Sequence, residues 1–218
     1  MNRIHNLSTN VSLITEWINE LRNVECQNQR MVFRRNLERI GEIAAYEISK
    51  TLDYKEVNVQ TPLANKASKT LESQPVVMTI LRAGVPLFNG VMNYFDKADA
   101  GFVAAYRKEN GSEISVRQEY VTCPNIAGRP LIVTDPMLAT GSSLKEALNE
   151  ILEIGEPSSL HFICAIAAQE GVDFIKNEFP QMEIWCGTID PSLDDKKYIV
   201  PGLGDAGDLS FGNKLQNS

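Results

Sequence analysis

The stretch from Leu131 to Leu152 constrains the fold more than any other. Leu131–Thr134 is an apolar run with β-branched residues, typical of a buried strand. Asp135-Pro136 ends this strand, because proline cannot donate to a sheet ladder. Small residues follow at 139–143, and apolar side chains then recur at helical spacing, at Leu144, Ala147, Leu148, Ile151 and Leu152. Ser143 and Glu146 have the spacing of a capping box, so we expect Ser143 to cap this helix.

Such a loop can bind an anion. It collects unpaired backbone N–H groups and the positive end of the helix dipole at one point. Small side chains let a phosphate approach these groups, and the hydroxyls of Thr140, Ser142 and Ser143 add donors. Asp135 would repel a phosphate but can accept hydrogen bonds from sugar hydroxyls. The pattern favours a sugar phosphate, although an ordinary β–α turn with a serine cap explains the loop about equally well.

Composition narrows the class of protein. The 218 residues are enough for one substantial domain. Its 21 basic and 28 acidic residues give a formal net charge of −7, which argues against a nucleic-acid surface but not against small anionic substrates. We expect a cytoplasmic protein with no membrane partner, because no apolar run could span a bilayer and no signal peptide is evident. Cys164 and Cys186 lie in apolar runs, which favours buried free thiols, and His161 is interpreted as structural.

The remaining chain alternates between strand-like and helix-like segments. We expect residues 1–11 to be irregular and helices at about 13–21 and 29–52, after Pro86, and between Gly171 and Pro180. Strands are expected at Pro75–Leu81, Gly101–Tyr106, Ser115–Val121, Ser159–Ala167 and Met182–Ile189. Val57–Thr61 alternates like a half-buried strand. Asn110-Gly111 is typical of a hairpin turn. This alternation predicts an α/β fold, with a mainly parallel sheet and helices on both faces.

The C-terminal segment is less regular. From Asp190 onward we expect an irregular cap over the strand ends, without a helical stripe. Gly202-x-Gly204-x-x-Gly207 spells a dinucleotide-binding pattern, but such a site needs a following helix and an acidic residue about 20 positions later. We interpret these glycines as letting the backbone approach a flat base.

Two long motifs resemble one family. Asp135–Ser143 resembles the phosphoribosyl diphosphate loop of uracil phosphoribosyltransferases, and Tyr198–Asp208 resembles their uracil-binding segment. Two shorter matches, Ile80–Gly84 and Tyr106-Arg107, keep the family's order, and the likeness covers roughly residues 30–212. The resemblance implies a type I phosphoribosyltransferase domain over 1–218, with a helical extension to about 52, a hairpin flap and a uracil-binding cap from about 190. It also implies that uracil and 5-phosphoribosyl 1-diphosphate react to give UMP and pyrophosphate.

The resemblance assigns roles to matching residues. It implies that the diphosphate substrate contacts Arg82, Arg107, Asp205 and the loop residues Asp135, Pro136, Met137, Leu138, Ala139, Thr140, Gly141, Ser142 and Ser143. Uracil would be bound by Ile199, Gly204, Asp205 and Ala206, and catalysis would fall to Asp205, Arg107 and Asp135. Mg²⁺ would arrive with the substrate, near Asp205. GTP activation and a homodimer or homotetramer are also implied.

Several positions depart from the family pattern. Lys108 follows Arg107 where an acid is usual, Ser142 replaces a glycine, Gln169 a proline, and Leu209 a basic residue. The resemblance also implies a strained loop with an unusual peptide bond at Ala83-Gly84. Arg30, Arg34, Arg35 and Arg39 form either a solvated basic face or a regulatory or subunit contact. Two other functions remain open, namely a non-catalytic pyrimidine-nucleotide regulator that binds RNA and a phosphoribosyltransferase for another base.

Overall fold

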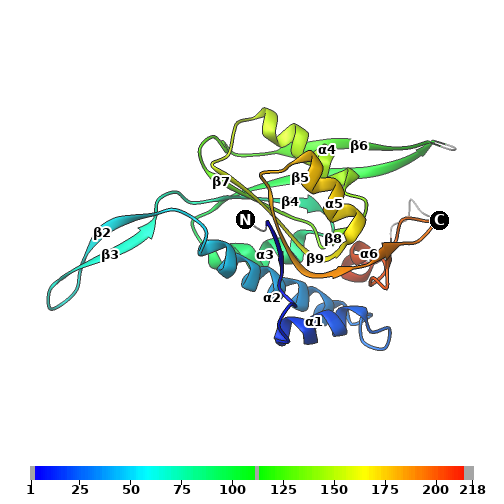
Figure 1. Ribbon diagram of the computed structural model, residues 1–218, viewed down its shortest axis with the longest axis horizontal. Coiled ribbons are helices and arrows are strands. Elements are labelled where there is room, and N and C mark those ends of the chain that lie inside the picture. The colour runs from blue at the N-terminus through cyan, green and yellow to red at the C-terminus, as the bar shows by residue number, and fades with distance from the viewer. Residues whose placement is uncertain (1–2, 111–112, 214–218) are drawn as a thin grey trace.

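A mainly parallel sheet organises the molecule (Figure 1). The computed structural model describes residues 3–110 and 113–213, with the backbone alone for 105–110 and 113–119. The strands lie in the order β1 (Ile4–Asn6), β10 (Glu183–Asp190), β9 (Ser159–Ala168), β7 (Pro130–Thr134), β4 (Val76–Leu81), β5 (Asp99–Asn110) and β6 (Glu113–Thr122). Only β5 and β6 are antiparallel within that order, and the short β8 (Met137–Leu138) pairs with β9. The expected fold class is confirmed.

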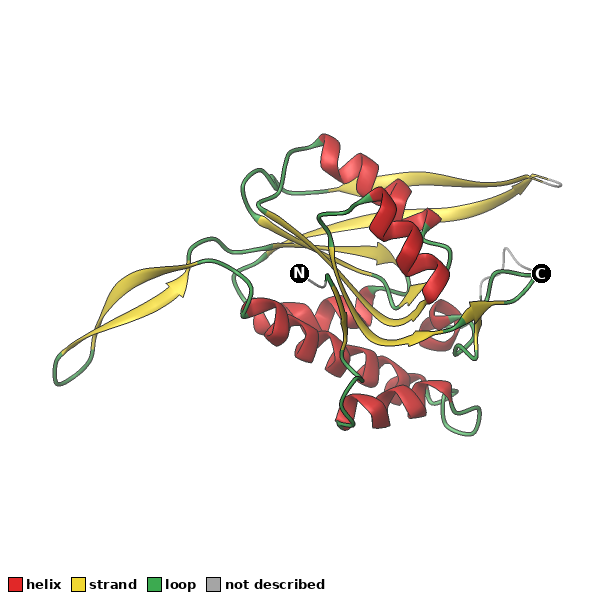
Figure 2. Ribbon diagram, viewed as in Figure 1, coloured by secondary structure: helices red, strands yellow, loops and turns green. Residues whose placement is uncertain are grey.

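Helices cover both faces of the sheet (Figure 2). One face packs against α1 (Leu13–Arg22), α2 (Arg30–Ser49) and α3 (Val85–Tyr94), and the other packs against α4 (Ser142–Glu153) and α5 (Gln169–Glu178). Proline in the first turn begins α3, as expected, since its missing N–H needs no partner there. Ile132 and Val133 are adjacent in β7 and face opposite core clusters, which is why this strand is apolar throughout.

Two N-terminal predictions were wrong. Residues 1–11 include β1, which pairs with β10 from Ile4 opposite Ile184, a contact too distant in sequence for local patterns to reveal. Val57–Thr61 was expected to be half-buried, yet β2 (Tyr54–Gln60) and β3 (Asn65–Leu71) form an almost fully exposed two-stranded ribbon. This ribbon and the β5–β6 hairpin reach out in opposite directions along the long axis (Figure 1).

The C-terminal segment carries more structure than expected. Strands β11 (Ser192–Leu193) and β12 (Ile199–Val200) pair, and the short helix α6 (Ala206–Phe211) follows. Six residues are too few to produce a readable helical stripe. The segment still differs from a dinucleotide site, because α6 has only six residues.

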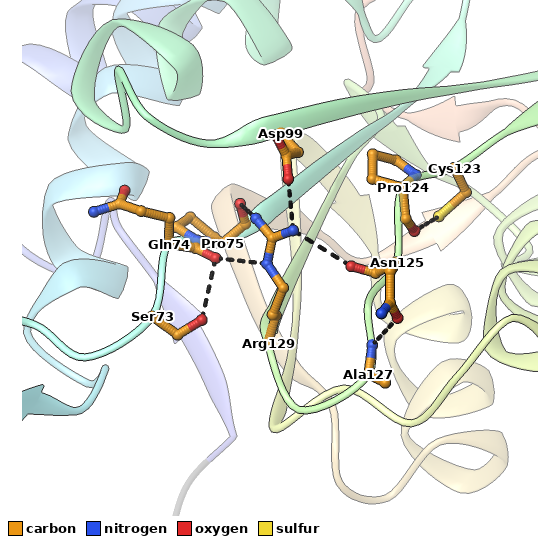
Figure 3. Close-up of polar contacts among 9 residues, drawn as sticks. All are labelled: Ser73, Gln74, Pro75, Asp99, Cys123, Pro124, Asn125, Ala127 and Arg129. Carbon is orange, nitrogen blue, oxygen red and sulfur yellow. Dashed lines mark hydrogen bonds and ion pairs between the residues drawn. The ribbon is translucent and has the colours of Figure 1, made fainter.

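At the amino ends of the strands, Arg129 joins three segments (Figure 3). Its Nε donates to the Gln74 carbonyl at 3.0 Å and Nη2 to the Pro75 carbonyl at 3.2 Å, just before β4. Nη1 lies 2.6 Å from the Asp99 carboxylate, where β5 begins. Arg129 therefore holds the starts of β4 and β5 against the start of β7.

The buried polar residues behave as expected. All four cysteines are free, and burial raises the pKa of the Cys186 thiol to about 12. His161 is buried beside Trp185, whose indole N–H lies 3.3 Å from His161 Nδ1, and these contacts agree with a structural role for His161.

Within residues 3–110 and 113–213, no helix combines the length and apolarity that crossing a membrane requires.

Candidate active site

Several residues singled out from the sequence lie at the carboxyl ends of the parallel strands. Arg82 directly follows β4, Asp135 directly follows β7, and Gln169 directly follows β9. Strands β4, β7 and β9 are adjacent and parallel, so these residues emerge at one edge of the sheet. Ligand sites in open α/β sheets form at this edge. The strand order thus brings together motifs that lie far apart in the sequence.

The loop before α4 differs from the expected capped turn. Helix α4 begins at Ser142, and its N-cap is Gly141 with φ of 85°, without a side-chain cap bond. The expected Ser143 cap is therefore wrong, because glycine supplies a left-handed conformation that serine adopts only at a cost. The hydroxyls of Thr140 and Ser142 lie 3.1 Å apart, and the Ser142 N–H lies 3.3 Å from Thr140 Oγ1. Small polar groups therefore surround the helix N-terminus.

Asp135 and Pro136 are fixed to the neighbouring strand. The Asp135 N–H donates to the Ile163 carbonyl at 3.1 Å, and Asp135 Oδ1 accepts from the Met137 N–H at 3.4 Å. The Pro136 carbonyl accepts two N–H groups of β9, those of Ala165 and Ile166, both at 3.0 Å. The half-buried Asp135 side chain therefore sits on a rigid support.

Arg82 connects this edge with the C-terminal segment. Its Nη2 lies 3.2 Å from Asp208 Oδ1 and 3.1 Å from the Gly212 carbonyl, while 41% of the side chain stays exposed. The unusual peptide bond is the cis bond Leu81–Arg82, rather than the expected Ala83-Gly84. The loop after β4 is thus in direct contact with helix α6.

The segment from Tyr198 to Asp208 can offer a ligand mostly main-chain groups. The Ile199 side chain is buried in the core, so this residue can contribute to a site mainly through its main chain. Asp205 is the N-cap of α6, and its Oδ1 accepts from the Asp208 N–H at 2.9 Å. A cavity of about 280 Å³ lies against this segment, and residues at its wall include Gln27, Arg30, Gly204, Asp205, Asp208 and Leu209.

Comparison with known proteins identifies the family. The sequence model described as uracil phosphoribosyltransferase matches residues 8–213. The chain belongs to the uracil phosphoribosyltransferase family. A curated uracil phosphoribosyltransferase of Porphyromonas gingivalis is 45% identical over 217 residues, covering 99% of this chain and 100% of that protein. One of Thermococcus gammatolerans is 37% identical over 207 residues, covering 94% and 91%.

A solved structure has the same overall fold. The AQ2163 protein from Aquifex aeolicus superposes with a TM-score of 0.86 at 34% identity, covering 97% of this chain and 99% of that one. The family model and the curated relatives make the present chain an enzyme of the group that transfers phosphoribosyl units. Neither the regulator nor an enzyme for another base is favoured by these matches.

The predicted flap is described only in its backbone. Strands β5 and β6 form the expected hairpin, but the Arg107 and Lys108 side chains and the turn at 111–112 fall outside the described part of the chain. Leu209, which replaces a basic residue of the family pattern, is half-buried and packs against the core. Its apolar side chain thus supports α6 from within.

Several residues around this family site were missed from the sequence. Asp190 ends β10 and pairs with Arg22 of α1, and Gln27 contacts the Leu203 carbonyl at 3.2 Å. Arg34, predicted as part of a basic face, donates to the Ser210 carbonyl at 2.7 Å, whereas Arg35 pairs with Glu38 at 2.8 Å. An acidic residue directly after an apolar strand was the available signal for Asp190. The remaining partners depend on tertiary contacts.

Proposed function

We propose that this chain transfers the phosphoribosyl group of 5-phosphoribosyl 1-diphosphate to N1 of uracil, which gives UMP and pyrophosphate in pyrimidine salvage. The observation that carries the proposal is the meeting of two family motifs at one sheet edge. The Asp135 loop follows β7, and the Tyr198–Asp208 segment reaches the loop after β4 through the Arg82–Asp208 contact. A sugar-phosphate site and a base site thus have a common edge.

For the sugar phosphate, the proposal assigns the loop 139–143 to the 5-phosphate. Backbone N–H groups at the start of α4 and the hydroxyls of Thr140, Ser142 and Ser143 supply donors, with Pro136, Met137 and Leu138 shaping the approach. Asp135 accepts hydrogen bonds from ribose hydroxyls. Arg82 and Arg107 neutralise the departing diphosphate, which requires Arg82 to exchange or share its contact with Asp208.

Magnesium fits this site as an ion carried by the substrate. Among the described residues no group of three or more His, Cys, Asp or Glu side chains could hold a metal. Mg²⁺ usually binds one or two carboxylates together with substrate phosphates and water. Asp205 lies beside the proposed reacting centre and is the carboxylate assigned to orient the base or contact such an ion. The metal would supply charge neutralisation for the leaving pyrophosphate.

For the base, the proposal assigns the edge of uracil to main-chain groups around Ile199, Gly204 and Ala206. Uracil presents O2 as an acceptor, N3–H as a donor and O4 as an acceptor along one edge. Cytosine instead has an acceptor at N3 and an amino donor at C4. Backbone donors and acceptors cannot exchange roles by rotating, unlike a hydroxyl group. Cytosine would therefore leave buried polar groups unpaired, which sites of this kind reject strongly.

The test is a comparison of initial rates with uracil, 5-fluorouracil and cytosine at saturating phosphoribosyl diphosphate and Mg²⁺. We expect kcat/KM for uracil to exceed that for cytosine by about 10³ or more. Because fluorine at C5 leaves the recognised edge unchanged, 5-fluorouracil should remain a substrate. Comparable rates for cytosine and uracil would refute the assignment of this segment to base recognition. Absence of pyrophosphate release with every base would refute the activity itself.

The proposal includes a homodimer or homotetramer. The β2–β3 ribbon supports it, because a two-stranded ribbon with almost all side chains exposed gains little stability from its own chain. Leu63 at its turn is 97% exposed, and Val59 is 45% exposed. Sedimentation equilibrium of the full chain and of a variant with a shortened ribbon would test this. A monomeric full chain would contradict it.

Two further elements of the proposal rest on the resemblance. GTP is proposed as an allosteric activator, to be tested by initial rates with and without it. A cytoplasmic location is proposed as well, supported by four unpaired cysteines, which suit a reducing compartment. No nucleic-acid or membrane partner is included.

A further inference from the structure

The uracil-reading segment has little structure of its own. Between Pro191 and Asn213, the last residue that the structure describes, this region contains only the two-residue strands β11 and β12 and the six-residue helix α6. Elements this short are not stable in isolation, because a helix nucleus is costly and a short ribbon gains few contacts. The shape of this segment must therefore depend on contacts with the rest of the molecule.

The N-terminal helical extension supplies such contacts at Gly202. Arg22 and Asp190 form a two-bond ion pair, with Nη2–Oδ1 at 2.6 Å and Nη1–Oδ2 at 2.8 Å. Arg22 Nη1 also donates to the Gly202 carbonyl at 3.0 Å, and the Gly202 N–H donates to Asp190 Oδ2 at 2.9 Å. Both polar backbone groups of Gly202 are thus held by one ion pair.

Gly202 cannot relax independently of its neighbours. Its φ is 60°, and a Cβ there would lie 2.0 Å from the Ile199 carbonyl oxygen. The next residue is also held, since Gln27 Nε2 donates to the Leu203 carbonyl at 3.2 Å. These contacts fix the backbone between Ile199 and Gly204, two of the residues assigned to the uracil edge.

The ion pair is sheltered from water, unlike most surface pairs. The Asp190 side chain is 5% exposed and that of Arg22 is 20% exposed. A planar guanidinium bonded to both carboxylate oxygens fixes direction as well as distance. Removing one partner leaves the other charge buried and the Gly202 group unbonded. Neither side chain lines the cavity beside Asp205, so contact with substrate is not needed for this effect.

We propose that Arg22, Asp190 and Gln27, together named the extension clamp, position the uracil-reading backbone and so set base affinity and discrimination. Arg22 and Asp190 are positioning residues rather than catalytic ones. The inference rests on the proposed uracil phosphoribosyltransferase reaction and deepens it. It gives α1 and the turn after it a role in specificity, although both precede every motif that resembles the family.

The test separates base binding from diphosphate binding. Arg22→Met keeps the aliphatic stem and removes the guanidinium, so we expect KM for uracil to rise about tenfold or more. KM for phosphoribosyl diphosphate should stay within about twofold of the wild-type value, because the loop proposed to bind it lies between β7 and α4 and Arg22 does not support that loop. The preference for uracil over cytosine should fall, and Arg22→Lys should be intermediate, since lysine cannot make the two parallel bonds.

Arg129→Met is the matched control, because it removes a similarly bonded arginine at the opposite edge of the sheet. It should lower stability while leaving both KM values within about twofold. If Arg22→Met does not fold, Asp190→Asn decides the question, because Asp190 also lies outside the cavity beside Asp205. That variant keeps an acceptor for the Gly202 N–H but removes the charge that holds Arg22, and it should raise KM for uracil about threefold.

Two failures can be told apart. An active wild type whose clamp variants keep KM for uracil, or raise both KM values equally, would overturn the inference and leave the proposed function intact. A folded wild type that releases no pyrophosphate with any base would refute the proposed function and the inference with it.

Discussion

The two edges of the parallel sheet use arginine in opposite ways. At the amino edge, the Arg129 side chain is 23% exposed and bonds to two carbonyls just before β4 and to Asp99. At the carboxyl edge, the Arg82 side chain is 41% exposed, and its contacts are with Asp208 and Gly212 of the C-terminal segment. Arg129 therefore stabilises the scaffold, whereas Arg82 joins two loops and keeps part of its surface open to a ligand.

The edges also show that the size of a hollow does not identify a site. The amino edge has a hollow of about 480 Å³, whereas the cavity beside Asp205 holds about 280 Å³. Polar groups around the larger hollow bond to one another. His5 Nε2 lies 3.0 Å from the Glu183 carboxylate, and His161 Nε2 lies 3.0 Å from the Ser159 hydroxyl. Groups paired in this way leave less for a ligand to bind.

In the comparison of the two edges, the largest effect we predict belongs to the amino edge. The pKa of His161 is lowered to about 4, mainly by burial. The nearby Glu183 carboxylate partly opposes this shift, and His5 adds slightly to it. Between about pH 6.5 and 4 the unfolded chain therefore binds a proton that the folded chain does not. The free energy of unfolding should fall by about 3 kcal/mol from this residue as pH drops across that window.

Denaturant unfolding at pH 7 and pH 4.5 measures this effect. In His161→Gln, which keeps an acceptor for the Trp185 N–H, the pH-dependent loss should be smaller than in the wild type by most of that amount. An equal loss in both proteins would show that His161 is not the titrating group. Activity at pH 7 should be unaffected, in keeping with a structural edge.

The next effect belongs to the carboxyl edge. Asp135→Asn keeps the shape of the side chain but removes the charge that would accept ribose hydroxyls. Hydrogen bonds to charged groups are worth roughly 1.5–3 kcal/mol, so kcat/KM should fall by about 10–150-fold. The thermal midpoint should change little, because the backbone N–H of Asp135 and the Pro136 carbonyl still bond to β9. A folded variant with unchanged turnover would remove Asp135 from the proposed site.

Arg129→Met should show the opposite pattern to Asp135→Asn, with a loss of stability and nearly unchanged activity. Its effect should be somewhat smaller. It removes donors to the Gln74 and Pro75 carbonyls, while the Asp99 side chain, 57% exposed, can be solvated instead. We expect a loss of about 2 kcal/mol in the free energy of unfolding and nearly unchanged kcat/KM. If instead activity fell without a loss of stability, the amino edge could not be assigned to stability alone and the carboxyl edge to the site alone.

Much of this fold could be predicted because its strands are buried on both faces. Leu131–Thr134 and Ser159–Ala167 read as strands from apolar content alone, and α4 from its stripe. The N-terminal strand β1 was missed because its pairing with β10 joins residues about 180 positions apart in the chain. The exposed ribbon was misjudged because β2 alternates without burying either face.

The site was less predictable in its details. The sequence correctly placed Asp135 at the end of a strand and the loop before a helix, but it assigned the helix cap to Ser143, whereas Gly141 provides it through a positive φ. A cap motif and a left-handed glycine lie only two residues apart, so local patterns could not separate them. The Arg22–Asp190 pair was invisible because neither residue belongs to a motif and their contact depends on tertiary packing.

The smallest effect we predict tests this corrected loop. Ser142 is the first residue of α4 and Gly141 takes the positive φ, so Ser142 itself needs no glycine-like conformation. Its hydroxyl lies 3.1 Å from that of Thr140, beside the proposed phosphate. Ser142→Gly should therefore raise KM for phosphoribosyl diphosphate about threefold, within the range of one neutral hydrogen bond.

Ser142→Ala separates the hydroxyl from backbone flexibility. If the hydroxyl binds phosphate, Ala and Gly variants should raise KM for phosphoribosyl diphosphate by similar factors, with KM for uracil unchanged. If only the Gly variant weakens binding, the loss comes from a more flexible helix start, since glycine is the poorer helix former. A lower KM in the Gly variant would mean that serine strains the loop, and that the carboxyl edge favours the glycine usual in this family.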